Sequence, residues 1–212
     1  MVGVASLLAI GGLAIVLRGP AVRSGGPVSP GAIISKGQPI DPGVDQSVGY
    51  LLTNEGKEPA IIERVRVVGV TGPIEVLGVL ARLHMGDRGS LLMLAGFPPP
   101  EYPSKPLAEE HVVPVPATTS ANGSPDEGLQ LVVGLRATGE GIGRIGGIEV
   151  TYRVGKQRYR ISNSGYGMLC APQSRFYNPD PKVSVEKCPD DGSAEHFDKK
   201  FVDFRVPSEG AS

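Results

Sequence analysis

Apolar and polar residues alternate with a period of two along most of the chain, and this alternation predicts β-strands. Turn signals rich in Gly, Pro, Asn and Asp separate the alternating stretches, and no long stretch after residue 18 shows a clean helical period. Roughly seven to nine short strands at this spacing predict an all-β fold, an immunoglobulin-like antiparallel β-sandwich in the broad sense. The expected strands span residues 47–53, 61–70, 74–84, 90–95, 111–116, 129–137, 142–154, 157–162 and 165–170.

A β-hairpin over residues 148–161 is the best-defined element. The pair Gly155-Lys156 suits a two-residue type II′ turn, because glycine adopts the positive φ of the first position at no steric cost. A two-residue turn fixes the register and gives the hairpin two different faces. The expected core face carries Val150, Tyr152, Tyr159 and Ile161, and the expected solvent face carries Thr151, Arg153, Arg158 and Arg160.

Residues 2–17 form an unbroken apolar run. As a helix this run spans about 24 Å, somewhat less than the ~30 Å hydrocarbon core of a bilayer. Its three glycines, Gly3, Gly11 and Gly12, suit a membrane helix better than a soluble one. We therefore expect an uncleaved single-pass transmembrane helix at residues 1–18, with the rest of the chain extracytoplasmic at the cell membrane. A cleaved signal peptide and a buried helix of a soluble protein are the alternatives.

The charges around this run oppose that orientation. No basic residue precedes it, whereas Arg18 and Arg23 follow it, and basic residues normally stay on the cytoplasmic side. We expect the missing basic region to lie upstream of Met1, which is then not the true start of the protein.

Composition divides the rest of the chain into three parts. A stretch rich in Gly, Pro and Ser at residues 19–40 is expected to be a flexible linker. The β-sandwich follows at 41–170, and a polar C-terminal segment at 171–212. Within the sandwich, residues 97–116 contain seven prolines, which exclude a central strand and favour a stiff loop lying over the domain. A proline-rich recognition ligand is the alternative, since two P-x-x-P patterns occur there.

Cys170 and Cys188 are the two cysteines of the chain. Their spacing matches no zinc motif, and an exported domain with two cysteines most simply forms one disulfide. The bond would tie the C-terminal segment to the last strand and contribute roughly 3 kcal/mol in the chain-entropy model. Two free buried thiols in a cytosolic protein are the alternative.

The hairpin and the strand before it carry an excess of positive charge. The net charge of −1 opposes polyanion binding by bulk charge, but residues 129–160 hold six Lys and Arg against two acids. Arg153 opposite Arg158 is unfavourable unless an anion lies between them. We expect the face formed by Arg153, Lys156, Arg158 and Arg160 to bind one of two kinds of anion. The first is the protein's own acidic C-terminal segment. The second is an anionic cell-envelope polymer, a lipid head group or an acidic partner; nucleic acid is not expected outside the membrane.

Other motifs have weaker support. Residues 141–146 match G-x-G-x-x-G, but the strand expected after them favours a bend over a nucleotide site. His84, Met85 and Met93 are more typical of one surface histidine and two core methionines than of a soft-metal site. The acidic stretch 190–198 lacks EF-hand spacing, and no G-x-S-x-G elbow is present. We therefore expect no catalytic residues, no metal and no cofactor.

Residues 51–65 (LLTNEGKEPAIIERV) resemble the first hairpin of many bacterial extracytoplasmic β-sandwiches. Residues 127–132 (EGLQLV), residues 143–152 and the closing Cys170 look like a loose group of uncharacterised membrane-anchored exported proteins of actinobacterial type. The resemblance covers about residues 45–170. It implies a β-sandwich outside the membrane and no particular activity.

Together these features predict a non-enzymatic binding or structural module of the cell envelope. Its expected partners are the lipid bilayer, through residues 2–17, and an anionic envelope polymer or a membrane or exported protein. An accessory subunit of a membrane protein complex is the alternative, with the anchor packed on partner helices through its glycines.

Overall fold

The structure is a computed structural model that describes residues 21–31, 36–85, 93–116, 127–180, 182, 184–188 and 200–207. Strands dominate this part of the chain and form three sheets. Sheet A runs in the order β1 (Val22–Ser24), β13 (Gln157–Asn163), β12 (Gly147–Val154), β5 (Ala60–Val68) and β15 (Phe201–Arg205), with β9 (Val112–Val113) also paired to β5. Sheet B runs in the order β2 (Val28–Pro30), β4 (Asp45–Asn54), β10 (Glu127–Ala137), β6 (Ile74–Met85) and β8 (Lys105–Pro106), with β7 (Met93–Ala95) also paired to β4.

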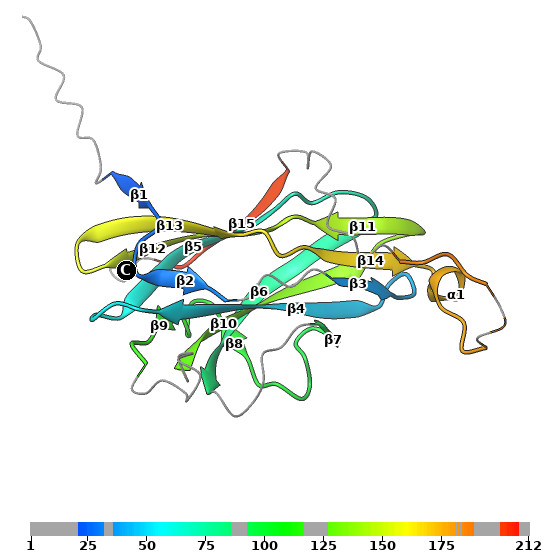
Figure 1. Cartoon of the computed structure of the whole chain (residues 1–212), viewed down its shortest axis with the longest axis horizontal. Coiled ribbons are helices and arrows are strands. Elements are labelled where there is room, and N and C mark those ends of the chain that lie inside the picture. The colour runs from blue at the N-terminus through cyan, green and yellow to red at the C-terminus, as the bar shows by residue number, and fades with distance from the viewer. Residues whose placement is uncertain are drawn as a thin grey trace, which may run out of the picture.

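A smaller sheet C contains β11 (Gly141–Ile145), β14 (Gly167–Ala171) and β3 (Lys36–Pro39). The short helix α1 (Gln173–Phe176) follows β14. Sheet C and α1 lie at one end of the molecule, and the β12–β13 turn lies at the other end (Figure 1).

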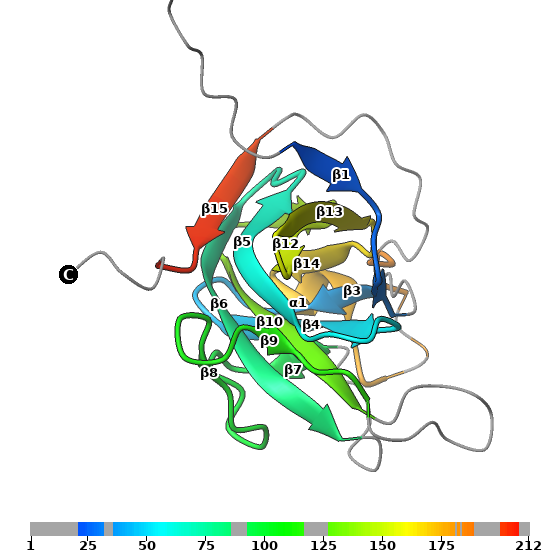
Figure 2. The same ribbon diagram turned by 90° about the vertical axis from the view of Figure 1, so that its left-hand side faces the viewer.

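Sheets A and B pack face to face, as the two layers of Figure 2 show. One continuous core lies between them, because alternate residues of the strands in both sheets are apolar and buried. Its best-buried members include Ile62, Val65, Val67, Val150 and Tyr152 from sheet A and Leu52, Leu129, Leu131 and Leu135 from sheet B. The predicted all-β sandwich is confirmed, while its immunoglobulin-like subtype stays a prediction.

Most of the predicted strands are present in the described residues, and one of them is divided in a way that the sequence did not indicate. The single strand expected over residues 142–154 is two strands, β11 and β12, which belong to different sheets. The chain changes sheet at Gly146 and Gly147. Gly147 has a φ of 125°, and a β-carbon there would lie 2.1 Å from the Asn163 carbonyl oxygen. The G-x-G-x-x-G pattern is therefore a bend followed by a strand, as predicted, and no helix follows it.

The prediction of a flexible linker over residues 19–40 is wrong for its described part, which forms β1, β2 and β3. The side chain that orders β1 and β2 comes from far along the chain. The Tyr152 hydroxyl donates to the carbonyl oxygen of Gly25 at 2.9 Å and accepts from the Val28 N–H at 3.2 Å. Gly26 packs so closely that a β-carbon would lie 2.3 Å from the same hydroxyl. The sandwich thus begins earlier than residue 41.

The proline-rich segment covers the outer face of sheet B, as predicted for a stiff loop. Gly78 and Gly134 lie opposite each other on β6 and β10, and the ring of Phe97 fills the space that their missing side chains leave. Farther along, the Tyr102 ring lies 4.6 Å from the guanidinium carbon of Arg82. Within this segment the strands β8 and β9 are two residues long each, so the strand expected at 111–116 is much shorter than predicted.

The predicted disulfide between Cys170 and Cys188 is confirmed, with the two Cα atoms 5.8 Å apart. Beyond it the chain returns to sheet A as β15, which pairs with β5 and which the sequence did not predict. The expected membrane anchor at residues 1–18 lies outside the described residues. None of the helices in the described part is long and apolar enough to cross a membrane.

Candidate functional site

The hairpin predicted over residues 148–161 has the expected register. Arg153 pairs with Arg158, Thr151 with Arg160 and Tyr152 with Tyr159, and Gly155 adopts a φ of 54°. Tyr152 is fully buried, and its ring stacks on that of Tyr159 with 5.5 Å between centroids. The side chains of Arg153, Arg158 and Arg160 are 41–47% exposed on the outer face of sheet A, and Lys156 is exposed at the turn.

A β-bulge in the neighbouring strand β5 adds charged groups to the same face. Thr151 pairs with Arg64 and the next residue, Tyr152, pairs with Ile62, so Glu63 is the extra residue. A bulge of this kind turns two successive side chains to one side of the sheet. Glu63 and Arg64 therefore both lie on the outer face, while Ile62 and Val65 stay in the core. The spacing of three between the apolar positions 62 and 65 is the signal in the sequence that marks this bulge.

Three carboxylates each contact two or three arginines across strands β13, β12, β5 and β15. Glu63 lies 2.7 Å from Arg158 and 3.8 Å from Arg153. Glu149 lies 3.2 Å from Arg66 and 3.6 Å from Arg160. Asp203 of β15 forms a two-pronged ion pair with Arg64 and also lies 3.6 Å from Arg205 and 4.0 Å from Arg66. We call this set the arginine face: Arg64, Arg66, Arg153, Arg158, Arg160, Arg205, Glu63, Glu149 and Asp203.

Within the described residues, the C-terminal segment contacts a different part of the face from the one expected. Its Asp203 contacts Arg64, Arg66 and Arg205, whereas the hairpin arginines contact Glu63 and Glu149 of the sandwich itself. The hydrogen bonds from Arg64 lower the pKa of Asp203 and raise the pKa of the Arg64 guanidinium. Asp203 is thus firmly ionised at neutral pH, and β15 is fixed to β5 by charge as well as by its backbone.

The arginine face keeps a surplus of positive charge, because its six arginines exceed its three carboxylates by three. Six guanidinium groups offer about thirty N–H donors, and three carboxylates supply about twelve acceptor positions. These three carboxylates can therefore satisfy fewer than half of the donors. The Nε atom of Arg66 is buried and has no hydrogen-bond partner within the described residues. This arrangement is chemically suited to binding an extended or multivalent anion.

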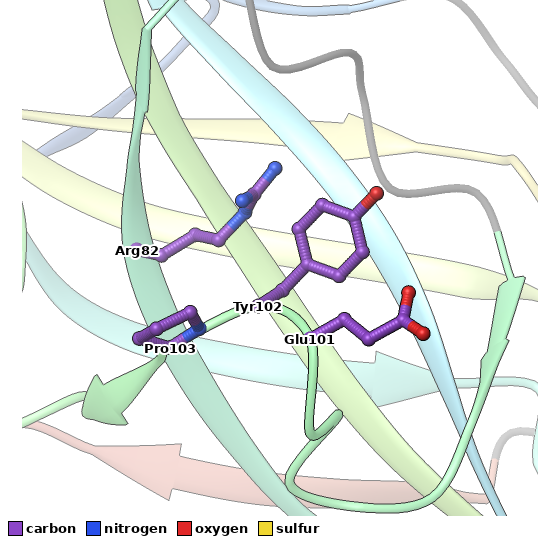
Figure 3. A pocket seen from close by; sticks show the side chains of 4 residues that line it. All are labelled: Arg82, Glu101, Tyr102 and Pro103. Atoms are coloured by element: carbon purple, nitrogen blue, oxygen red, sulfur yellow. The ribbon is translucent and has the colours of Figure 1, made fainter.

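A second feature lies on the opposite side of the sandwich, over the outer face of sheet B. An open hollow of about 410 Å³ is lined by Arg82, Glu101, Tyr102 and Pro103, whose side chains are shown in Figure 3. Arg82 is buried and its Nε donates to Gln130 at 2.8 Å. The lining combines a cation, a carboxylate and a phenol ring, and it holds no serine, threonine or cysteine among the residues described.

The histidines and acidic residues form no metal centre in the described part of the chain. His84 is 7% exposed, so its assignment as a surface histidine is wrong: β6 places it on the side of sheet B that other segments cover. Met93 packs partly buried against the core, as predicted. The acidic stretch 190–198 and His196 lie outside the described residues.

No protein-family model matches the chain, and no curated protein matches it. Among solved structures, the chain is similar to the ASH / PapD-like domain of human CEP192 (PapD-like domain 7), with 10% sequence identity and a TM-score of 0.35. The match covers 79% of this chain and 99% of that domain.

Proposed function

We propose that the chain is a non-enzymatic binding module of the cell envelope and that its arginine face binds an anionic partner. The observation that carries this proposal is the surplus of three positive charges on the outer face of sheet A. Stability alone gives little reason for such a face. Exposed ion pairs contribute about 0–1 kcal/mol each, and the single carboxylate of Glu63 must offset the repulsion between two opposed arginines, Arg153 and Arg158.

The chemistry of arginine also favours an external anion. The planar guanidinium binds carboxylate and phosphate through two parallel hydrogen bonds, and it is more weakly hydrated than an ammonium group. The arginines of the hairpin are more than 40% exposed, so their outer edges are accessible. Those of β5 are about one-quarter exposed and lie beside them. An extended anion lying across the strands would contact both groups.

Two features support a position outside the cytoplasm. The Cys170–Cys188 disulfide is typical of proteins in oxidising compartments. The apolar run at residues 2–17 has the composition of a membrane anchor. We propose that this run holds the sandwich at the cell membrane on the extracytoplasmic side, where the anionic partner is an envelope polymer, a lipid surface or an acidic exported protein.

Polyanion binding by two charge-matched variants tests the proposal. The face triple variant is Arg153→Gln/Arg158→Gln/Arg160→Gln, which reduces the surplus charge of the arginine face to zero. The off-face triple variant is Lys105→Gln/Arg136→Gln/Arg175→Gln, which removes the same charge from cations paired with Glu110, Asp45 and Glu186 elsewhere on the molecule.

The full chain is held in discs of neutral lipid, and its affinity for inorganic polyphosphate and for polyglutamate is measured. One charge pair at 4 Å in water contributes about 1 kcal/mol, so we expect the face triple variant to lose affinity by about a hundredfold. The off-face triple variant should lose much less. Equal losses in the two variants would show that net charge, and not the arginine face, governs binding.

A further inference from the structure

We infer that the arginine face lies against the anionic lipid head groups of the membrane in which residues 2–17 of the same chain are anchored. This inference rests on the proposed function and names the ligand of its binding face. It has three independent supports: the place where the chain enters the fold, the length of the tether and the distribution of charge.

The chain enters the fold beside the arginines of the hairpin. β1 is an edge strand that runs parallel to β13 and pairs Val22 with Arg158 and Ser24 with Arg160. Just before it, the Ala21 carbonyl oxygen accepts a hydrogen bond from the Gln157 side chain at 3.3 Å. Figure 2 shows β1 at one edge of sheet A and β15 at the other. The N-terminal run is therefore connected to the sandwich at the border of the arginine face.

The connection is short. The apolar run ends at Leu17 and the chain is fixed to the fold from Ala21, so the tether reaches at most about 14 Å when fully extended. Adjacent strands lie about 4.8 Å apart, so the face from β13 to β15 is itself about 14 Å wide. A sandwich tethered this closely has two simple orientations. It lies with the outer face of sheet A on the head groups, or it stands upright on its β1 edge.

Charge favours the first orientation. The arginine face has a surplus of three positive charges while the whole chain has a net charge of −1, so the remainder carries −4. On the opposite side of the sandwich, the segment over sheet B carries Glu101, Glu109 and Glu110, and Lys105 and Arg82 offset part of their charge. An anionic surface thus attracts the arginine face more strongly than it attracts the opposite side. Each basic residue at such a surface favours contact by about fivefold, and screening at physiological salt leaves this attraction effective within about 8 Å.

The natural chain contains no tryptophan. The fluorescence of a single introduced tryptophan can therefore report which side of the sandwich faces the lipid. Phe201→Trp places it on the arginine face at the edge far from the tether, where residue 201 is 52% exposed beside Arg66. Tyr102→Trp places it on the opposite side, beside Arg82. Both positions already hold an aromatic ring over an arginine, so the two variants are matched. Val22→Trp marks the tethered edge in either orientation.

The full-length variants are reconstituted into vesicles of phosphatidylcholine, with or without phosphatidylglycerol, that contain lipid with a spin label on its head group. We expect strong quenching of Phe201→Trp and Val22→Trp in the anionic vesicles, and weak quenching of Tyr102→Trp. Quenching of Phe201→Trp should fall to the level of Tyr102→Trp under each of three changes. These are the omission of phosphatidylglycerol, a higher salt concentration, and the addition of the face triple substitutions. Val22→Trp should stay quenched in all cases.

The possible failures are distinguishable. Quenching of Val22→Trp without quenching of Phe201→Trp in anionic vesicles means that the sandwich stands upright, which overturns this inference and leaves the anchored module intact. No quenching of Val22→Trp means that the chain is not anchored, which overturns both the inference and the membrane part of the proposed function. If soluble polyphosphate binds the vesicle-anchored chain as tightly as the chain in neutral discs, the face is free and its ligand is a polymer.

Discussion

Removing the hydroxyl group of Tyr152 tests how firmly the N-terminal strands are fixed to sheet A. That hydroxyl donates to the Gly25 carbonyl and accepts from the Val28 N–H. In Tyr152→Phe the exposed Gly25 carbonyl can bind water, whereas the Val28 N–H is buried with its residue, which is 3% exposed. One unpaired buried donor costs about 1–3 kcal/mol. Because the ring itself remains, we expect Tyr152→Phe to lower the free energy of unfolding by this amount.

The measurement is denaturant unfolding of the full chain in mild detergent, combined with hydrogen exchange over residues 22–30. The control is Tyr159→Phe, which keeps the same ring stack and removes a hydroxyl that has no hydrogen bond to the described residues; it should change stability by less than about 0.5 kcal/mol. Exchange should accelerate in β1 and β2 of Tyr152→Phe before it does in β5. Unchanged stability together with unchanged exchange over residues 22–30 would refute the role given to this hydroxyl.

Three further predictions concern the charge, packing and covalent bond that hold the sandwich together. Asp203→Asn should accelerate hydrogen exchange in β15 at pH 7, and the difference from the wild-type protein should vanish as the pH falls through the lowered pKa of Asp203, where the wild-type carboxylate also loses its charge. Gly134→Ala places a β-carbon 2.4 Å from the Phe97 ring and should cost about 1–3 kcal/mol in thermal unfolding, whereas Gly139→Ala, whose β-carbon has 3.7 Å of clearance, should be close to neutral. Cys188→Ala opens the disulfide and should lower stability by roughly 3 kcal/mol while polyphosphate affinity stays unchanged, since Cys170 belongs to β14, which lies toward the end of the molecule away from the hairpin turn (Figure 1).

The sequence was sufficient where the determining residues are neighbours in the chain. The hairpin of β12 and β13 has a two-residue turn and strict alternation, so its register and its two faces follow from local pattern alone. The same reasoning found the exposed Arg153, Arg158 and Arg160. It did not find their partner Glu63, which lies 95 residues before Arg158 in the chain. Only the pairing of β12 with β5, and the bulge at Glu63, bring the carboxylate to the arginines.

The N-terminal and C-terminal strands were missed for a related reason. Composition predicts whether a segment can form a strand from its own residues, and β1 and β2 are poor in the apolar residues that would indicate one. The hydroxyl of Tyr152, more than a hundred residues away in the chain, holds these two strands in place through its hydrogen bonds. β15 has the alternation of a strand, but five residues give too short a pattern, and its position depends on the attraction between Asp203 and Arg64. Long-range contacts of this kind leave no mark on local periodicity.

The most direct measurement of anion binding by the arginine face is the salt dependence of polyphosphate affinity. Each cation that pairs with a phosphate releases a counterion, so the slope of log affinity against log salt counts the cations engaged. We expect the face triple variant to have a slope shallower than the wild-type slope by roughly two to three, and the off-face triple variant to keep the wild-type slope. Identical slopes in the two variants would contradict the assignment of the outer face of sheet A as the binding site.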